Sequence, residues 1–368
     1  MSIPFLDLSR QHKELASVLN ASLERTLARG VYILGPEVEA FETEWAKFSS
    51  ASSAAGVASG TDALALALIA SGAVRPEHDD EVITSPLTAG YSVLAIKNAG
   101  GVPVFADIDP QTLTLDPDPV RQAITPRTRA IMPVHLYGQL ADMPAIKQIA
   151  KRHGLTVIED AAQAHGATRE FESGDSVPHA AAFSFYPTKN LGAIGDAGAV
   201  VSNDTTLIDR VKILRQGGHE PALQGSVPGR NSRLDEIQAS ILRVKLGYLD
   251  DWNERRRAIA RRYNDAFKNT SLSLPEESKE RRHVYHIYAV RSDRRDALQS
   301  HLRLRGIETM IHYPFLVHRQ PLFRQAGSGN LPVAEREAKR ILSLPLYPQL
   351  RDDEIQEVID AVLEFEES

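Results

Sequence analysis

The chain contains no cysteine among its 368 residues. Disulfide bonds, thiolate metal ligands and cysteine nucleophiles are therefore excluded, and the composition fits a reducing compartment. No apolar run approaches the roughly 18 residues that a membrane-spanning helix needs. The first residues, MSIPFLDLSRQHKEL, lack the basic and apolar regions of a signal peptide. A basic surplus is also missing, since 42 Lys and Arg oppose 48 Asp and Glu. We therefore expect a cytoplasmic protein that binds neither nucleic acid nor membranes.

The order of apolar runs predicts two domains. Between residues 81 and 215, short apolar runs alternate with helical patterns, which is typical of an α/β fold with a mainly parallel central sheet. After about residue 275 the elements become shorter, which indicates a smaller C-terminal α+β domain. We assign residues 1–250 to the large domain and 251–368 to the small one. The expected strands are 81–85, 102–107, 130–135, 156–159, 181–185 and 199–202, then 286–291 and 308–313; a helix is expected over 334–341.

The most informative stretch is FSFYPTKNLGAIGDAGAVV, residues 183–201. It predicts two buried strands joined by a glycine-rich loop that carries Lys189. Lysine is rarely buried without a partner, but a lysine amine with a lowered pKa condenses with the aldehyde of pyridoxal phosphate (PLP). The alternative is a lysine that reaches solvent from a strand end.

Two further sites lie at or after expected strand ends, where ligands of open α/β sheets bind. Ser59-Gly60-Thr61 leads into an apolar helix, whose free N–H groups can bind an anion. Asp160 ends an apolar run, and a carboxylate there can pair with a protonated pyridine nitrogen. In both places a helix N-cap is the alternative. Gln163 and His165 follow Asp160 closely.

Three other features have simpler interpretations. Residues 217–233 form a long polar loop, which favours a functional role. The run Arg255-Arg256-Arg257, continued by two arginines at 261–262, indicates the solvated face of a helix. The spacing of His312 and His318 fits no common zinc pattern, so no metal is expected.

In this order, the motifs resemble the PLP-dependent sugar aminotransferases of the DegT/DnrJ/StrS type over almost the whole chain. The matching stretches include YILGPEVEAFE, ASGTDALALAL, PVHLYG, VIEDAAQAHGA, FSFYPTKNLGAIGDAGAVV, GRNSRLDEIQASIL and GIETMIHYP. The resemblance implies a PLP-dependent transferase fold of type I, similar to aspartate aminotransferase. It also implies a homodimer with active sites at the subunit interface.

The resemblance assigns a role to each matching residue. Lys189 matches the Schiff-base lysine, Asp160 the partner of the pyridine nitrogen and Gln163 the contact to the cofactor hydroxyl. Asn231 matches the residue that reaches the phosphate from the other subunit. The phosphate cradle corresponds to Gly60, Thr61 and Ser184, and the substrate side to Tyr186, His312, Tyr313 and His318. One departure concerns the aromatic that stacks on the cofactor: many relatives read T-F-I-A-T, whereas this chain reads Thr88-Ala89-Gly90-Tyr91, so Tyr91 lies two places later.

The implied reaction moves an amino group from an amino acid, expected to be L-glutamate, to a nucleotide-linked keto-sugar. The FYPTKNLGAIGDAGA and IHYP motifs favour C3 of a dTDP-3-keto-6-deoxyhexose. A C4 or UDP-sugar aminotransferase of the same family remains open. Lys189 argues against a PLP-dependent sugar dehydratase, which has histidine there. The GAIGDAG loop lacks the G-x-G-x-x-G spacing of a dinucleotide oxidoreductase and precedes a strand. The intact set of Lys189, Asp160 and Gln163 argues against a catalytically silent regulatory protein.

Overall fold

The computed structural model describes residues 2–75, 77–169, 180–219, 229–278, 281–323 and 330–367. Its centre is a seven-stranded sheet in the order β1-β8-β7-β5-β4-β2-β3. Neighbouring strands are parallel except at β8, which runs antiparallel to both β1 and β7. The expected mainly parallel sheet is confirmed. The strands are β1 Ser53–Val57, β2 Glu81–Thr84, β3 Val102–Phe105, β4 Thr128–Met132, β5 Thr156–Asp160, β7 Ala180–Ser184 and β8 Gly198–Ser202.

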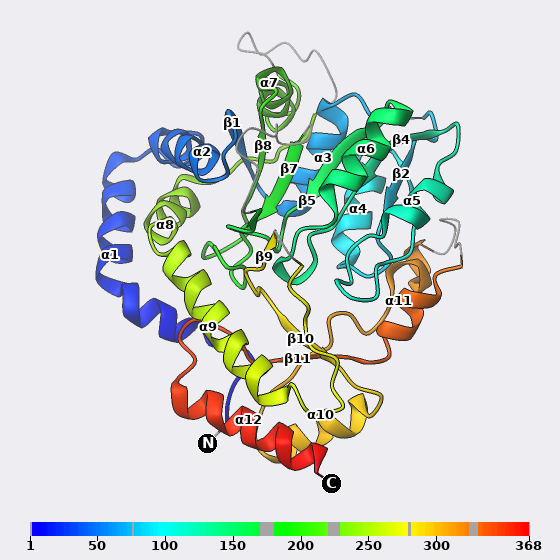
Figure 1. The fold of residues 1–368 in the computed structure, drawn as a ribbon. Helices are drawn as coiled ribbons and strands as arrows, with labels where there is room; N and C mark the ends of the chain where they lie inside the picture. Colours follow the sequence, from blue (N-terminus) through cyan, green and yellow to red (C-terminus); the bar gives the residue numbers. More distant parts are fainter. Residues whose placement is uncertain are drawn as a thin grey trace.

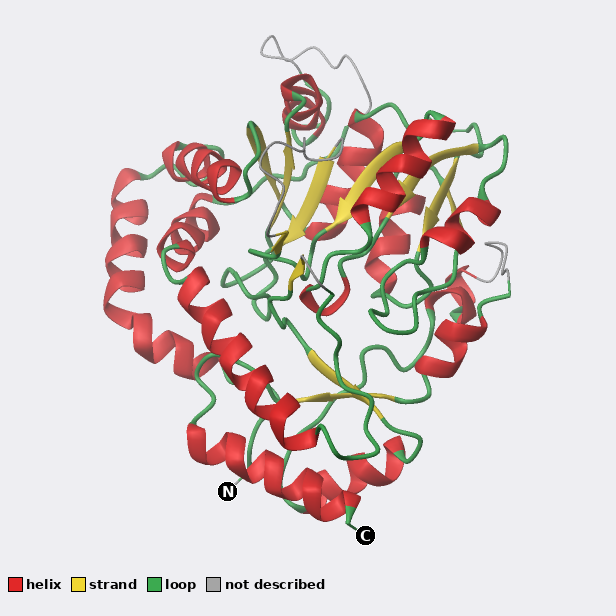
Figure 2. Ribbon diagram, viewed as in Figure 1, coloured by secondary structure: helices red, strands yellow, loops and turns green. Residues whose placement is uncertain are grey.

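Helices cover both faces of this sheet (Figures 1 and 2). Successive strand side chains point to opposite faces, so Ala180 and Ala182 belong to one core cluster and Ala181 and Phe183 to another. The first cluster is covered by α3 Gly60–Ala70, α4 Gly90–Asn98 and α7 Thr205–Leu214. The opposite face is covered by α2 Pro36–Phe48, α5 Pro117–Ala123, α6 Met143–His153 and α8 Glu236–Leu246.

The C-terminal part is smaller and contains a two-stranded antiparallel sheet of β10 Tyr288–Arg291 and β11 Ile341–Leu344. The strand predicted at 308–313 is wrong, because only Met310 of that segment forms a bridge, to Ser343. The strand β11 was not predicted, and its first residue, Ile341, was assigned to the expected helix 334–341. Its four apolar and small residues are fully buried, and periodicity cannot separate so short a run into helix or strand.

Short elements and long helices complete the C-terminal part. A two-stranded pair joins β6 Thr168–Arg169 to β9 Arg281–Arg282. Two short 3-10 helices, η2 Val317–Arg319 and η3 Pro321–Phe323, follow the IHYP motif. The helices are α9 Leu249–Phe267, α10 Arg295–Leu304, α11 Pro332–Glu337 and α12 Asp352–Glu366. The domain division at residue 250 stays a prediction.

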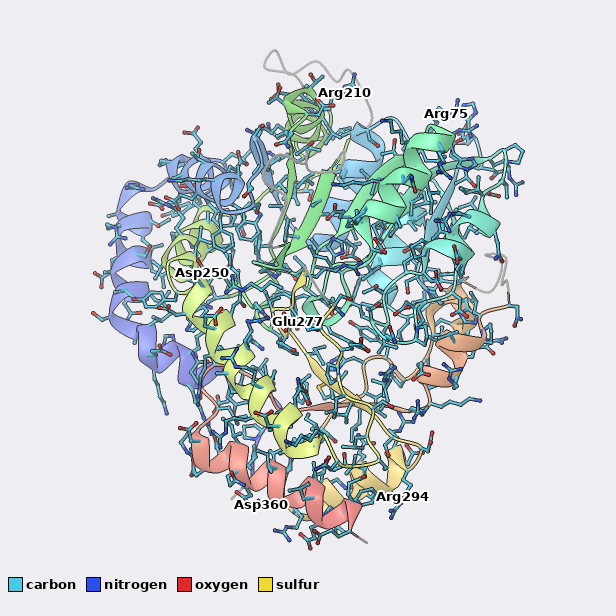
Figure 3. The ribbon with its side chains drawn as sticks, in the orientation of Figure 1. Arg75, Arg210, Asp250, Glu277, Arg294 and Asp360 are labelled. Carbon is cyan, nitrogen blue, oxygen red and sulfur yellow. The ribbon has the colours of Figure 1, made fainter. Side chains whose placement is uncertain are left out.

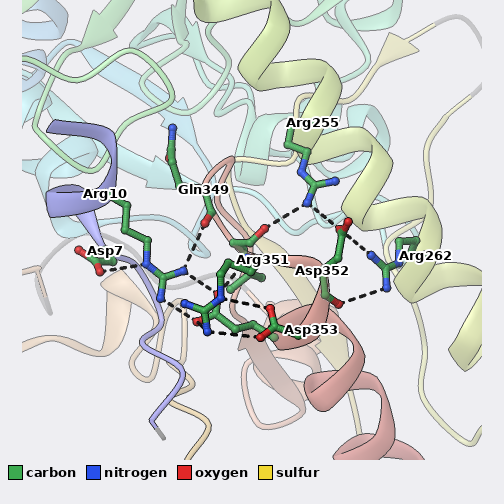
Figure 4. A network of polar contacts seen from close by, with 10 residues as sticks. Asp7, Arg10, Arg255, Arg262, Gln349, Arg351, Asp352 and Asp353 are labelled. Atoms are coloured by element: carbon green, nitrogen blue, oxygen red, sulfur yellow. Dashed lines mark hydrogen bonds and ion pairs between the residues drawn. The ribbon is translucent and has the colours of Figure 1, made fainter. Parts of the chain in front are cut away.

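The N-terminal segment packs against this C-terminal part. Ile3 is buried in the same cluster as Tyr263 and Phe365, and its backbone pairs with Ile307. Arg10 of α1 Leu8–Arg29 donates two hydrogen bonds, of 2.6 and 2.7 Å, to the carboxylate of Glu354 in α12. The same network of polar contacts continues to α9 in Figure 4. The N-terminal helix α1 is therefore hydrogen-bonded to the C-terminal helix α12.

The arginine run of α9 differs from the expected solvated face. Arg255 and Arg262 do reach outward, and both pair with Asp352 at 2.9 Å (Figure 4). Arg256, however, is only 5% exposed, and its guanidinium donates to the backbone carbonyls of Tyr285 and Leu346. Consecutive residues of an α-helix are rotated by about 100° around its axis. Three adjacent arginines therefore point in three different directions, and the side chain of Arg256 points inward. Other charged side chains lie on the surface, such as Arg75, Arg294 and Asp360 in Figure 3.

Candidate active site

The loop between β7 and β8 holds Lys189 in a tightly fixed backbone. Lys189 N–H donates to the carbonyl of Tyr186 at 2.8 Å, and Ala193 N–H donates to that of Phe185 at 2.8 Å. A Cβ atom on Gly192 would lie 2.3 Å from the carbonyl oxygen of Pro187, so only glycine fits there. From α8, the ammonium of Lys245 donates to the Gly192 carbonyl at 2.7 Å. The loop is therefore anchored both within itself and from a neighbouring helix.

The side chain of Lys189 is half-buried. Desolvation lowers its pKa from 10.5 to about 8, and the nearby Asp160 carboxylate opposes part of this shift. Among the described residues, no hydrogen bond or ion pair to its Nζ is formed. Lys189 also helps to lower the pKa values of His165, to about 3, and of His312, to about 4, and burial is the larger cause in both. A lysine amine therefore lies unpaired among a carboxylate and neutral imidazoles.

Asp160 ends β5 and is 4% exposed. Its backbone is held by Pro133 and His135, which continue the strand contacts beyond β4. Its Oδ2 accepts a 2.6 Å hydrogen bond from Ser92 Oγ, and its Oδ1 accepts one of 3.1 Å from the N–H of Ala162. The chain after Asp160 forms turns rather than a helix. Asp160 is thus a buried, oriented carboxylate at a strand end and not a helix N-cap.

The start of α3 lies against the last residue of β7, Ser184, and the first residue of β8, Gly198. Ser59 is the N-cap, and its Oγ accepts the N–H of Asp62 at 3.2 Å. A Cβ on Gly60 would lie 2.5 Å from the Cβ of Ser184, and one on Gly198 would lie 2.4 Å from the carbonyl of Ser59. The first N–H groups of a helix have no intrahelical partner, so they and the Ser184 hydroxyl form a close-packed cradle suited to an anion.

Asn231 is exposed, and its backbone forms an isolated bridge with Gln216. Its two neighbours are bound to their own chain, since Arg230 pairs with Asp62 at 3.0 Å and Ser232 Oγ accepts the N–H of Ala58 at 3.1 Å. The preceding part of the long loop, residues 220–228, lies outside the described residues.

Gln163 connects the sheet to the C-terminal part. Its Oε1 accepts the N–H of Tyr137 at 2.7 Å, and its Nε2 donates to the Tyr313 hydroxyl at 2.9 Å. The Tyr137 hydroxyl donates to the carbonyl of His312. His312 Nδ1 lies 2.9 Å from Ser343 Oγ in β11. The IHYP motif is therefore brought to the same region as Asp160 and Lys189.

Three of the side chains that were predicted to contact cofactor or substrate are not joined to Asp160 or Gln163 by a hydrogen bond among the described residues. His318 is buried, but the charged groups that act on it are Glu335, Arg319 and Asp107, and it packs against Phe105. Neither Lys189 nor Asp160 is among these groups. Tyr91, at the second position of α4, is 69% exposed, and Tyr186 is 51% exposed. As cofactor or substrate contacts, all three stay predictions.

Sequence reasoning missed His286 and Asn190. Asn190 donates through Nδ2 to Asn253 and to the Val284 carbonyl, and its Oδ1 faces His286 Nδ1 at 3.0 Å. Burial and Lys189 hold the pKa of His286 well below its ordinary value. The position of Asn190, directly after Lys189, was a usable signal, whereas His286 stands in no motif that could have marked it.

The residues present fit PLP. An unpaired amine of lowered pKa suits an aldehyde, a strand-end carboxylate suits a pyridinium nitrogen, and the cradle suits a phosphate. The donor set does not suit a metal: in the described parts of the chain, no three histidine or acidic side chains are grouped to hold one. Nor does any helix within those parts have the length and apolar content to cross a bilayer.

Fold and site together define the class of PLP-dependent transferases. The chain belongs to the DegT/DnrJ/EryC1/StrS aminotransferase family, whose model matches residues 14–363. Aminotransferases of this family depend on PLP, so the expected fold, enzyme class and cofactor are confirmed.

The proteins to which this chain is similar include one named as an enzyme and one named as a regulatory protein. A dTDP-3-amino-3,4,6-trideoxy-alpha-D-glucose transaminase of Streptomyces venezuelae is 46% identical over 371 residues, which cover 99% of this chain and 96% of the relative. A pleiotropic regulatory protein of Geobacillus stearothermophilus is 45% identical, with 99% of each chain covered. The crystal structure of S. venezuelae DesV in complex with a ketimine intermediate has a TM-score of 0.96 at 46% identity, covering 100% of this chain and 99% of that chain.

Proposed function

We propose that this protein transfers an amino group from an amino acid, with L-glutamate as the expected donor, to C3 of a dTDP-linked 3-keto-6-deoxyhexose. The observation that carries the proposal is Lys189, a half-buried amine of lowered pKa that interacts electrostatically with Asp160. The choice of C3 is supported by the names of two relatives, at 46% and 42% identity, which are both dTDP-3-amino-sugar transaminases.

Each side chain has a definable task. PLP, when bound, supplies an aldehyde and a ring that stabilises negative charge on the substrate carbon. Lys189 would bind it covalently and, as a free amine, would move a proton at the substrate carbon. Asp160 would keep the ring nitrogen protonated, and Gln163 would hold the ring hydroxyl. The α3 N-terminus, with Thr61 and Ser184, would hold the phosphate.

The assay compares keto-sugars that differ in one feature. Purified protein, loaded with PLP and excess glutamate, is given dTDP-3-keto, dTDP-4-keto and UDP-3-keto sugars, and the 2-oxoglutarate released beyond the one equivalent per site that glutamate alone produces is measured. We expect turnover with the first and a kcat/KM at least tenfold lower with the others. A preference for the UDP-sugar would favour the second candidate, because a relative at 39% identity is a UDP-sugar 3-aminotransferase. No release with any sugar would contradict the proposal.

The same proposal includes a cytoplasmic homodimer with shared active sites. Large apolar side chains are exposed around the start of α8, where Glu236 bonds to the backbone of Tyr32 and Gln238 to that of Ile194. Tyr32 is 48% exposed, Ile194 52% and Tyr186, from the Lys189 loop, 51%. A second copy that covers these side chains would bring a loop such as that of Asn231 to the neighbouring site.

Mixed dimers test the sharing. Asn231→Ala and Lys189→Ala chains are each expected to be weak or inactive alone. If Asn231 acts on the other subunit, a heterodimer holds one intact site, and about half of the dimers in an equal mixture recover activity. If it acts on its own chain, every site keeps one defect and the mixture stays inactive. Native mass spectrometry of the mixture confirms that the subunits have exchanged.

A further inference from the structure

A chain of three buried side chains leads from α4 to the strand-end carboxylate. Thr88 Oγ1 lies 2.9 Å from Ser92 Oγ, which lies 2.6 Å from Asp160 Oδ2. Thr88 is 2% exposed, Ser92 3% and Asp160 4%. Ser92 is in the first turn of α4, and Thr88 directly precedes the Ala89 cap. These hydrogen bonds therefore connect the beginning of α4 to the end of β5.

The donors and acceptors fix the direction of these hydrogen bonds. A carboxylate only accepts, so Ser92 gives its single hydroxyl proton to Asp160. The Ser92 oxygen then has only lone pairs left for Thr88, and Thr88 must be the donor. Each bond polarises the next, which strengthens the last one. The 2.6 Å separation is in the range of a charge-assisted O–H···O bond.

These bonds also hold the carboxylate in one rotation. Ser92 donates to Oδ2 and the N–H of Ala162 donates to Oδ1, so each carboxylate oxygen accepts a separate hydrogen bond. With both oxygens tied, the remaining lone pairs keep a single direction. Without the Ser92 bond, only the weaker 3.1 Å backbone contact resists rotation.

We propose that Ser92, backed by Thr88, is a positioning residue that orients and stabilises the Asp160 carboxylate for its contact with the cofactor ring. This inference rests on the proposed function, because it assigns Ser92 a role through Asp160. Ser92 does not touch the reacting atoms. The competing explanation is purely structural: the bond fastens α4 to β5 and the chemistry does not depend on it.

Four variants separate these explanations. Ser92→Ala removes the donor, Ser92→Thr keeps a hydroxyl, and Thr88→Val removes the backing donor with little change in shape. Ser240→Ala is the matched control, since Ser240 is a fully buried helix serine whose hydroxyl donates to a backbone carbonyl, that of Ile237, at 2.9 Å. Each is compared for melting temperature, PLP affinity of the apo-protein, visible spectrum of the bound cofactor and single-turnover rate with glutamate.

The expected pattern is selective. Ser92→Ala should lower the single-turnover rate roughly ten- to a hundredfold, the ratio that corresponds to a hydrogen bond to a charged group. It should also alter the cofactor spectrum and weaken PLP binding, with an unchanged KM for the keto-sugar. Ser92→Thr should restore rate and spectrum, and Thr88→Val should lose less than Ser92→Ala. Ser240→Ala should match the wild type in rate and spectrum.

Two outcomes overturn the inference. One is a Ser92→Ala protein with wild-type rate and spectrum; the other is a fall in melting temperature alone, as any buried hydroxyl could give. Failure of the proposed function is distinct. A wild-type protein that gains no visible absorbance with PLP removes both proposals, whereas one that binds PLP and reacts with glutamate but accepts no dTDP-sugar removes only the substrate assignment.

Discussion

The reactivity of Lys189 in the apo-protein gives a direct test of the site. Because burial disfavours the charged ammonium, the pKa of Lys189 is lowered from 10.5 to about 8. At pH 7 a lysine of ordinary pKa has roughly 0.03% of its amine in the free-base form, whereas a pKa of 8 gives roughly a tenth. The nucleophilic fraction of Lys189 is therefore about 300 times larger than that of an ordinary lysine.

Competitive acylation measures this fraction. Apo-protein is labelled with a trace of acetic anhydride between pH 6 and 11, and the modification of each lysine peptide is quantified by mass spectrometry. Lys189 labelling should rise with pH, with its midpoint near pH 8, and level off about one pH unit higher. Lys245 is the control for burial alone: its pKa is also lowered to about 8, but it is 5% exposed and bonded to Gly192, so it should label slowly at every pH.

The variant Asp160→Asn tests the sign of the electrostatic contribution. The Asp160 carboxylate raises the pKa of Lys189, against the larger effect of burial. Removing its charge should therefore move the labelling midpoint to lower pH. A midpoint near 10.5 in the wild type would refute the reasoning about burial. A midpoint that moves to higher pH in the variant would refute the placement of the two groups.

Three further predictions follow from the same contacts. In the PLP-loaded enzyme, Asp160→Asn should retain the cofactor but lower kcat by about two to three orders of magnitude, measured with glutamate and keto-sugar, because an amide stabilises a pyridinium poorly. Gly60→Ala should weaken PLP binding by at least tenfold in a fluorescence titration with a normal circular dichroism spectrum, since its Cβ would meet Ser184 at 2.5 Å. Hydrogen bonds from Arg10 lower the pKa of Glu354, so their stabilisation, about 2 kcal/mol, is present above the unfolded pKa and is lost as pH falls through the folded one. Glu354→Gln should thus lower the melting temperature at pH 7 and have a smaller effect near pH 4.

Local patterns allowed much of the sheet to be predicted. Most strands of the central sheet are apolar runs that lie between turn residues, and their alternation with helices predicts parallel pairing without tertiary information. Strand ends then identify where Asp160 and Lys189 should meet, because the carboxyl ends of parallel strands share one edge. The chemistry of the site follows from residue types at those ends.

The rest depends on tertiary contacts that one sequence does not display. Ser92 is a single serine in a helical pattern, and only the packing of α4 on β5 makes it a partner of Asp160. His286 is more than ninety residues from Lys189 along the chain. Arg256 is one of three adjacent arginines, and the packing of α9 against the backbone at Tyr285 and Leu346 decides which one is buried.

The neutral histidines explain how the site can bind an anionic cofactor without extra fixed positive charge. Burial and Lys189 together lower the pKa of His165 to about 3 and of His312 to about 4, so both are uncharged at neutral pH. A protonated imidazole here would repel the Lys189 ammonium and compete for Asp160. In the proposed site the phosphate would then be balanced by dipoles, such as those of the free N–H groups at the start of α3. We infer that the amine and the carboxylate retain distinct roles because the two imidazoles near them, His165 and His312, carry no charge.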